Sequence, residues 1–126
     1  MSYNFLVVDD SPIIRKMILR ALGLSKLDLG EIREAGDGLQ ALKILQDNWV
    51  DIVVTDIHMP EMTGIELVEQ MARDPLFSKI PVLVVSTERS ADAIAHLQSL
   101  GIHGYLNKPF TPEQIRDAVL KALAGA

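Results

Sequence analysis

Short apolar runs alternate with longer amphipathic segments along the whole chain. The runs at 4–8, 52–55 and 82–85 are rich in Val and Ile and do not alternate with charged residues, which is typical of strands buried on both faces. Two weaker runs, at 31–35 and 104–106, complete a set of five predicted strands. Charged residues within 31–35 indicate a strand at or next to the edge of a sheet.

A segment with helical spacing of apolar residues follows each predicted strand. Ser11, Asp37 and Thr111 stand where helix N-caps are expected, and a proline follows Ser11 and Thr111 directly. Strand–helix units repeated over 126 residues predict a single α/β domain with a parallel sheet, right-handed crossovers and helices on both faces. The residues expected to face the core are, helix by helix, Ile13, Ile14, Met17, Ile18, Ala21 and Leu22; Leu39, Leu42, Ile44 and Leu45; Ile65, Leu67, Val68, Met71 and Ala72; Ile94, Leu97 and Leu100; and Ile115, Ala118, Val119, Ala122 and Leu123.

Polar residues stand directly after four of the five predicted strands. The carboxyl ends of parallel strands share one edge of a sheet, and open α/β sheets bind ligands at that edge. Taken singly, each of these residues is explained by a helix cap or a solvated loop. Their coincidence on four strands instead indicates one functional site, made of Asp9 and Asp10, Asp56, Ser86 and Thr87, and Asn107 and Lys108.

Three carboxylates in such a site, from Asp9, Asp10 and Asp56, would repel one another. The repulsion is roughly 4 kcal/mol per pair at about 4 Å and an effective dielectric constant near 20. The acids therefore need a bound cation, or raised pKa values, to coexist. This arrangement predicts a magnesium site with one carboxylate left over to react.

The composition narrows the class of protein further. A net charge of −5 with no run among the twelve Lys and Arg residues argues against a nucleic-acid-binding surface. The absence of Cys excludes disulfides, thiolate catalysis and Cys-based zinc sites, and it suits a cytoplasmic location. No signal peptide and no apolar stretch long enough to insert into a membrane is expected.

Several motifs occur in a fixed order along the chain, and together they resemble a response-regulator receiver domain of the stand-alone, CheY-like type over essentially the full length. The resemblance implies a flavodoxin-like (βα)5 fold, with a doubly wound parallel five-stranded sheet in the order 2-1-3-4-5 and one receiver domain over 1–126. No effector domain is then expected after the receiver. The motifs are Phe5-Leu6-Val7-Val8-Asp9-Asp10-Ser11, Glu34-Ala35-Gly36-Asp37-Gly38, Asp56-Ile57-His58-Met59-Pro60-Glu61-Met62-Thr63-Gly64, Pro81-Val82-Leu83-Val84-Val85-Ser86, Gly101-Ile102-His103-Gly104-Tyr105 and Lys108-Pro109-Phe110.

The family implies a Mg²⁺-dependent transfer of a phosphoryl group from a sensor histidine kinase, or a phosphotransfer domain, to Asp56. By resemblance, Asp10 coordinates the metal directly and Asp9 acts through water, while Asp56 and the backbone carbonyl of His58 are further ligands. Lys108 is expected to contact a phosphoryl oxygen. The chain would thus phosphorylate itself rather than turn over a metabolite.

The resemblance also implies a conformational switch. Ser86 would donate its hydroxyl to another phosphoryl oxygen, and the inward movement of its loop would open space for Tyr105. Glu88 and His58 occupy positions that influence water access to the acyl phosphate in this family, so we expect them to set its lifetime. The downstream protein would bind the face formed by the fourth helix, fifth strand and fifth helix, which includes Glu88, Arg89, Asp92, His96, Asn107 and Arg116.

Other interpretations remain open from the sequence. Thr63 stands where the family most often has Asp or Asn, and we interpret it as a variant loop cap. A metal-dependent phosphatase of the haloacid-dehalogenase type is disfavoured because its first-strand acids are spaced Asp-x-Asp, and a binding module without phosphorylation is disfavoured by the intact site. Within the family, a chemotaxis regulator and a phosphorelay intermediate are both possible. The resemblance also implies that the kinase docks near Ile13, Ile14 and the Pro109-Phe110 loop.

Overall fold

The computed structural model describes residues 2–125 and contains all five predicted strands and all five predicted helices. In chain order the elements are β1 Tyr3–Val8, α1 Pro12–Gly23, β2 Leu29–Ala35, α2 Gly38–Asp47, β3 Ile52–Thr55, α3 Gly64–Arg73, β4 Val82–Ser86, α4 Ala91–Ser99, β5 Gly104–Asn107 and α5 Pro112–Ala124. The predicted N-caps are correct, because the side chains of Ser11, Asp37 and Thr111 each accept a hydrogen bond from a backbone N–H in the first turn of their helix.

The strands form one parallel sheet in the order β2-β1-β3-β4-β5. This is the flavodoxin-like α/β fold expected from the sequence, with β2 at one edge as its charged residues indicated. In the centre of the sheet, Val8 of β1 is in register with Thr55 of β3. The residues that follow these two strands therefore begin at the same level of the sheet edge.

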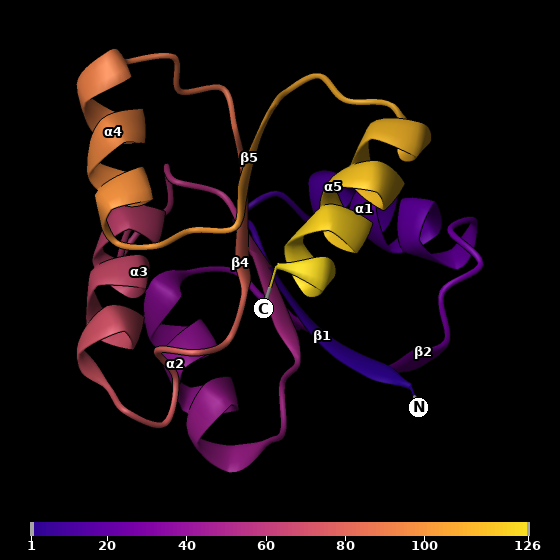
Figure 1. Ribbon diagram of the computed structural model, residues 1–126, viewed down its shortest axis with the longest axis horizontal. Helices are drawn as coiled ribbons and strands as arrows, with labels where there is room; N and C mark the ends of the chain where they lie inside the picture. The colour runs from indigo at the N-terminus through magenta and orange to yellow at the C-terminus, as the bar shows by residue number, and fades with distance from the viewer. Residues whose placement is uncertain (1, 126) are drawn as a thin grey trace.

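Helices cover both faces of the sheet, which is seen edge-on in Figure 1. Helices α1 and α5 pack on one face, and α2, α3 and α4 pack on the other. Successive residues of β1 alternate between the two cores: Leu6 and Val8 contact the larger helical layer, and Phe5 and Val7 contact the smaller one. This double burial explains why the central strands are apolar without alternation.

The predicted helix faces were too wide in several places. Ile13, Met17, Leu39 and Ala72 were expected to face the core but are exposed, with Ile13 having 71% of its surface accessible. A helix packed on a sheet buries only a narrow arc of its surface, and in α1 this arc is centred on Ile18 and its neighbours on the same side. Strand β2 also begins at Leu29, earlier than predicted, and β5 extends to Asn107.

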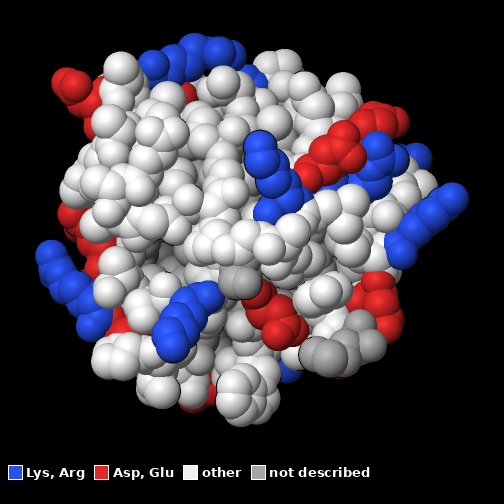
Figure 2. Space-filling model, viewed as in Figure 1, with Lys and Arg blue, Asp and Glu red and all other residues white. Residues whose placement is uncertain are grey.

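Charged side chains of both signs are scattered over the face shown in Figure 2, mostly towards its margin, and neither sign gathers into a broad patch there. Between residues 2 and 125, no helix combines the length and the apolar character needed to cross a membrane.

Candidate functional site

Three carboxylates meet at the carboxyl ends of β1 and β3. Asp9 and Asp10 follow β1, Asp56 follows β3, and one oxygen from each residue lies within 4.8 Å of the others. The pairing of the two strands continues into the site, because the N–H of Asp56 donates to the carbonyl of Val8 at 2.9 Å. The sequence prediction that these acids converge is therefore confirmed in the geometry of the fold.

Lys108 provides a counter-charge to two of the acids. Its Nζ atom lies 2.8 Å from Oδ2 of Asp9 and 3.0 Å from Oδ2 of Asp56. The carboxylates of Asp9 and Asp56 are buried, with 1% and 7% of these residues accessible, whereas Asp10 is exposed. Because the lysine arrives from the end of β5, the fold places it between the two buried acids.

Burial and ion pairing shift the pKa values of both Asp9 and Lys108. Burial raises the pKa of Asp9 above its usual 3.8, although Lys108 and the N–H of Ser11 both favour the ionised carboxylate. For Lys108, burial alone would lower the pKa, but the hydrogen bonds and charges of Asp9 and Asp56 outweigh it and raise the pKa. The lysine is therefore held as a cation inside a largely enclosed site.

The second oxygen of each buried acid is held by a backbone N–H. Ser11 donates to Oδ1 of Asp9 at 2.9 Å, and Ile57 donates to Oδ1 of Asp56 at 2.7 Å. Carboxylate oxygens are the ligands that Mg²⁺ prefers, and this metal keeps several waters in its shell. The cluster of Asp9, Asp10 and Asp56, with Asp10 open to solvent, fits such an ion.

The loop after Asp56 is closed by Gly64, where only glycine fits. The N–H of Gly64 donates to the carbonyl of Ile57 at 2.8 Å, and a Cβ added at this residue would lie 1.9 Å from the backbone oxygen of Asp56. Thr63 caps α3 by a capping box with Glu66, as the interpretation of Thr63 as a loop cap predicted. The tight turn fixes the backbone that carries Asp56.

Ser86 is the last residue of β4, and Tyr105 lies in the adjacent strand β5. The hydroxyl of Ser86 is buried and accepts from the N–H of Glu88 at 3.2 Å, while the hydroxyl of Tyr105 donates to the carbonyl of Glu88. Burial is the largest effect on the pKa of Tyr105 and raises it; Ser86 has the next-largest effect and lowers the pKa, the charges of Glu88 and Asp56 raise it, and the charge of Arg89 lowers it. Within residues 2–125, the Asp56 carboxylate accepts from Ile57 and Lys108 and not from Ser86.

His58 and Glu88 contact each other, which the sequence did not predict. Nε2 of His58 lies 3.0 Å from Oε2 of Glu88, so that the loop after β3 is joined to the loop after β4. The side chain of His58 is 60% exposed and that of Glu88 is 25% exposed. The pair thus connects the surfaces of the two loops that follow Asp56 and Ser86 in the chain.

Arg15 is a residue of the site that sequence reasoning missed. One of its guanidinium nitrogens donates to the backbone carbonyl of Asp9 at 2.6 Å, and its Nε lies 3.0 Å from Oε1 of Glu34 at the end of β2. The bidentate side chain therefore ties the loop that carries the acidic pair to the neighbouring strand. No sequence motif signals this contact, because it depends on the path of the loop.

Comparison with known proteins agrees with this fold. The response regulator receiver domain family matches residues 5–120. The chemotaxis protein CheY of Pseudomonas aeruginosa is 37% identical over 121 residues, covering 94% of both chains, and CheY1 of Helicobacter pylori is 34% identical over 115 residues, covering 90% of this chain and 91% of that protein. The structure of the chemotaxis response regulator CheY4 of Vibrio cholerae superposes with a TM-score of 0.86 at 31% identity, covering 97% of this chain and 99% of that one. The chain therefore belongs to the response regulator receiver domain family.

Proposed function

We propose that this chain is a phosphoacceptor, with Asp56 receiving a phosphoryl group from a sensor histidine kinase or a phosphotransfer domain. The observation that carries the proposal is the position of Lys108, whose ammonium group is bonded to the Asp56 carboxylate beside the two acids that follow β1. A reactive carboxylate, an adjacent acidic pair and a fixed cation are the groups that an aspartyl phosphorylation site requires.

In the proposed transfer, an oxygen of the Asp56 carboxylate attacks the phosphorus atom of the donor. A bond from oxygen to phosphorus forms, the bond from phosphorus to the donor nitrogen breaks, and the donor imidazole leaves with its electron pair. Lys108 is already bonded to an oxygen of Asp56, so it lies where it can bind an oxygen of the incoming group. The N–H of Ile57 orients the other carboxylate oxygen.

Asp10, Asp9 and Asp56, together with the backbone carbonyl of His58, are proposed to hold Mg²⁺. When bound, the metal offsets the charge that accumulates between the carboxylate and the phosphoryl oxygens. The exposed Asp10 is proposed as the direct ligand, and the buried Asp9, already bonded to Lys108 and Ser11, as a ligand through water.

The proposed output is a switch in the loop after β4. Phosphorylated Asp56 would bond the Ser86 hydroxyl, which requires Ser86 to give up its bond with the N–H of Glu88. The carbonyl that Tyr105 binds belongs to the same residue, Glu88, so movement of this loop releases the tyrosine. The face built from α4, β5 and α5 would change with it and bind a downstream protein.

The relatives named as chemotaxis proteins support a chemotaxis-type role rather than that of a phosphorelay intermediate. A cytoplasmic location is proposed together with this role. The exposed Ile13, with Ile14 and the Pro109-Phe110 loop, is the proposed kinase-docking area. His58 and Glu88 are proposed to set the lifetime of the phosphorylated state, since their contact joins the two loops beside the reactive carboxylate.

Intact-mass spectrometry after incubation with acetyl phosphate tests the proposal. With Mg²⁺ we expect an adduct of about 80 Da, which is one phosphoryl group, and a much smaller amount when the metal is chelated. Rapid release of phosphate from many phosphomonoesters would instead indicate a phosphatase of the haloacid-dehalogenase type. No adduct with or without Mg²⁺ would indicate a binding module that does not become phosphorylated.

A further inference from the structure

An apolar groove of about 450 Å³ lies at the end of the molecule opposite the acidic site. The last turn of α2 and the segments that follow α2 and α3 form it, and they lie together at the lower end of the view in Figure 1. Trp49 precedes β3, and Asp56 follows the same strand at its far end. The groove and the candidate phosphorylation site are therefore separated by the length of the sheet.

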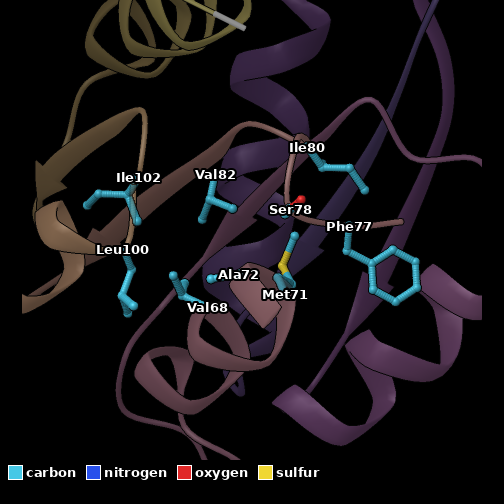
Figure 3. Close-up of a pocket in the computed structure, with 10 residues that line it drawn as sticks. Val68, Met71, Ala72, Phe77, Ser78, Ile80, Val82, Leu100 and Ile102 are labelled. Atoms are coloured by element: carbon cyan, nitrogen blue, oxygen red, sulfur yellow. The ribbon is translucent and has the colours of Figure 1, made fainter. Parts of the chain in front are cut away.

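The walls of the groove are exposed, but its floor belongs to the core. Trp49 and Leu76 have 90% and 81% of their surfaces accessible, whereas Phe77 is buried and Ile80 is half-buried. Phe77 and Ile80 also line a small neighbouring cavity of about 20 Å³, and Figure 3 shows them on the side of that cavity opposite Leu100. A large exposed Trp and Leu beside a fixed apolar floor are typical of a protein contact surface.

The charges around the groove are of one sign. Asp47 and Asp74 line it, and among residues 2–125 no Lys or Arg does so. Oδ1 of Asp74 accepts from the N–H of Leu76 at 2.8 Å, which holds this carboxylate next to the exposed leucine. The face of a Trp ring also attracts cations, so the indole and the two acids favour the same kind of ligand. A basic partner is complementary to this rim.

We propose that the groove binds a segment of a partner protein that presents an aliphatic or aromatic side chain next to Lys or Arg. The apolar side chain would pack on Phe77 and Ile80 between Trp49 and Leu76, and the basic residue would lie beside Asp47 or Asp74. A second copy of this chain is a poor occupant, because symmetric pairing would place the acidic rims of two chains with a net charge of −5 against each other.

The location of the groove has a functional consequence. It lies at the beginnings of β3 and β4, whereas the phosphorylation site lies at their ends. A protein bound in the groove would leave the acidic site accessible to a kinase. The groove would thus allow the chain to be anchored in a complex while it is being phosphorylated.

Trp49 is the only tryptophan, so its fluorescence reports directly on the groove. The full chain, labelled with ¹⁵N, is titrated with a panel of short synthetic peptides in which Leu, Ile, Phe or Met is flanked by Lys or Arg. We expect at least one peptide to bind with saturation below about 1 mM, with changes at the Trp49 indole and the residues around Leu76 and Ile80. Matched peptides with Glu in place of the basic residues should bind at least about tenfold more weakly.

Two variants and a control complete the test. Leu76→Gln should weaken peptide binding by about tenfold or more. Asp47→Lys should shift the preference of the groove towards the Glu peptides. The control is Leu24→Gln, at an exposed leucine that does not line the groove, and it should have no effect on binding. Labelling of Leu76→Gln by acetyl phosphate should equal that of the wild type, since the inference is independent of phosphoryl transfer. Absence of binding across the panel, equal binding of both panels, changes confined to other surfaces, or self-association through the groove would each overturn the proposal.

Discussion

The ammonium group of Lys108 lies 3.0 Å from Oδ2 of Asp56, although the two residues are 52 positions apart in the chain. Parallel pairing of the strands creates this contact, because β3 and β5 both end at the same edge of the sheet. The lysine is bonded to the buried Asp9 as well. One cation thus compensates two buried acids, and we expect the site to depend on it for stability as well as for the proposed chemistry.

Replacement of Lys108 by Met should therefore destabilise the fold. The change leaves Asp9 and Asp56 buried without a counter-charge, and we expect the free energy of unfolding to fall by about 2–4 kcal/mol at neutral pH without Mg²⁺. Addition of Mg²⁺ should stabilise this variant more than the wild type, because the ion would replace the missing positive charge. Urea denaturation with and without the metal measures both effects. Lys16→Met, at an exposed lysine of α1, is the control and should change little.

Asp9→Asn should make the metal-free protein more stable at neutral pH. Burial raises the pKa of Asp9 in the folded state, so ionisation of this group costs folding free energy above that pKa, even with Lys108 beside it. The cost is relieved as the pH falls through the folded pKa towards the ordinary value of 3.8. The stability difference between variant and wild type should accordingly shrink over this acidic range. A difference that is constant with pH would show that the ionisation of Asp9 is not its source.

Gly64→Ala should damage both the fold and the reactivity of Asp56. Its Cβ would lie 1.9 Å from the backbone oxygen of Asp56, so the turn must shift, and we expect a loss of about 2–4 kcal/mol in the free energy of unfolding. Gly23→Ala is a matched control, since a Cβ at the end of α1 meets nothing within 4 Å and should stabilise the protein by up to about 1 kcal/mol. Thermal unfolding and the rate of acetyl phosphate labelling measure the two effects, and equal behaviour of the two variants would contradict this explanation.

His58→Ala and Glu88→Ala should each speed the loss of phosphate from the phosphorylated protein, by a factor of about two to ten. The two side chains contact each other at 3.0 Å, so breaking the contact from either side loosens the same two loops. In the double variant, the dephosphorylation rate should rise by clearly less than the two single-variant factors multiplied together, because both substitutions break the same contact. Dephosphorylation rates after removal of the donor give the comparison. Rates equal to that of the wild type would show that the pair has no influence on lifetime.

The convergence of the acids was predictable because a parallel sheet leaves few alternatives, whereas the order of the strands was predicted from the resemblance to the receiver family. Once five strand–helix units are identified, residues such as Asp56 and Lys108 must lie at one edge, whatever the details of the loops. Helix caps such as Thr63 were predictable for a similar reason, since they depend on interactions within one turn. These features follow from local sequence and from general rules of topology.

Other features depend on geometry that the sequence pattern does not contain. The bonds of Arg15 to the Asp9 carbonyl and of His58 to Glu88 each join two loops whose paths are set by the whole fold. The exposed position of Ile13 depends on how far α1 is rotated on the sheet. The groove beside Trp49 escaped prediction because most of its residues come from the segments that follow α2 and α3, where apolar spacing gives no signal.

The most direct test of the account is to locate the phosphoryl group. Wild-type protein, Asp56→Asn and the control Asp51→Asn, at an exposed aspartate just before β3, are incubated with acetyl phosphate and Mg²⁺ and analysed by intact-mass spectrometry. Wild type and Asp51→Asn should gain about 80 Da, the mass of one phosphoryl group, and Asp56→Asn should gain nothing. A full adduct on Asp56→Asn would contradict the assignment of Asp56 as the phosphoacceptor.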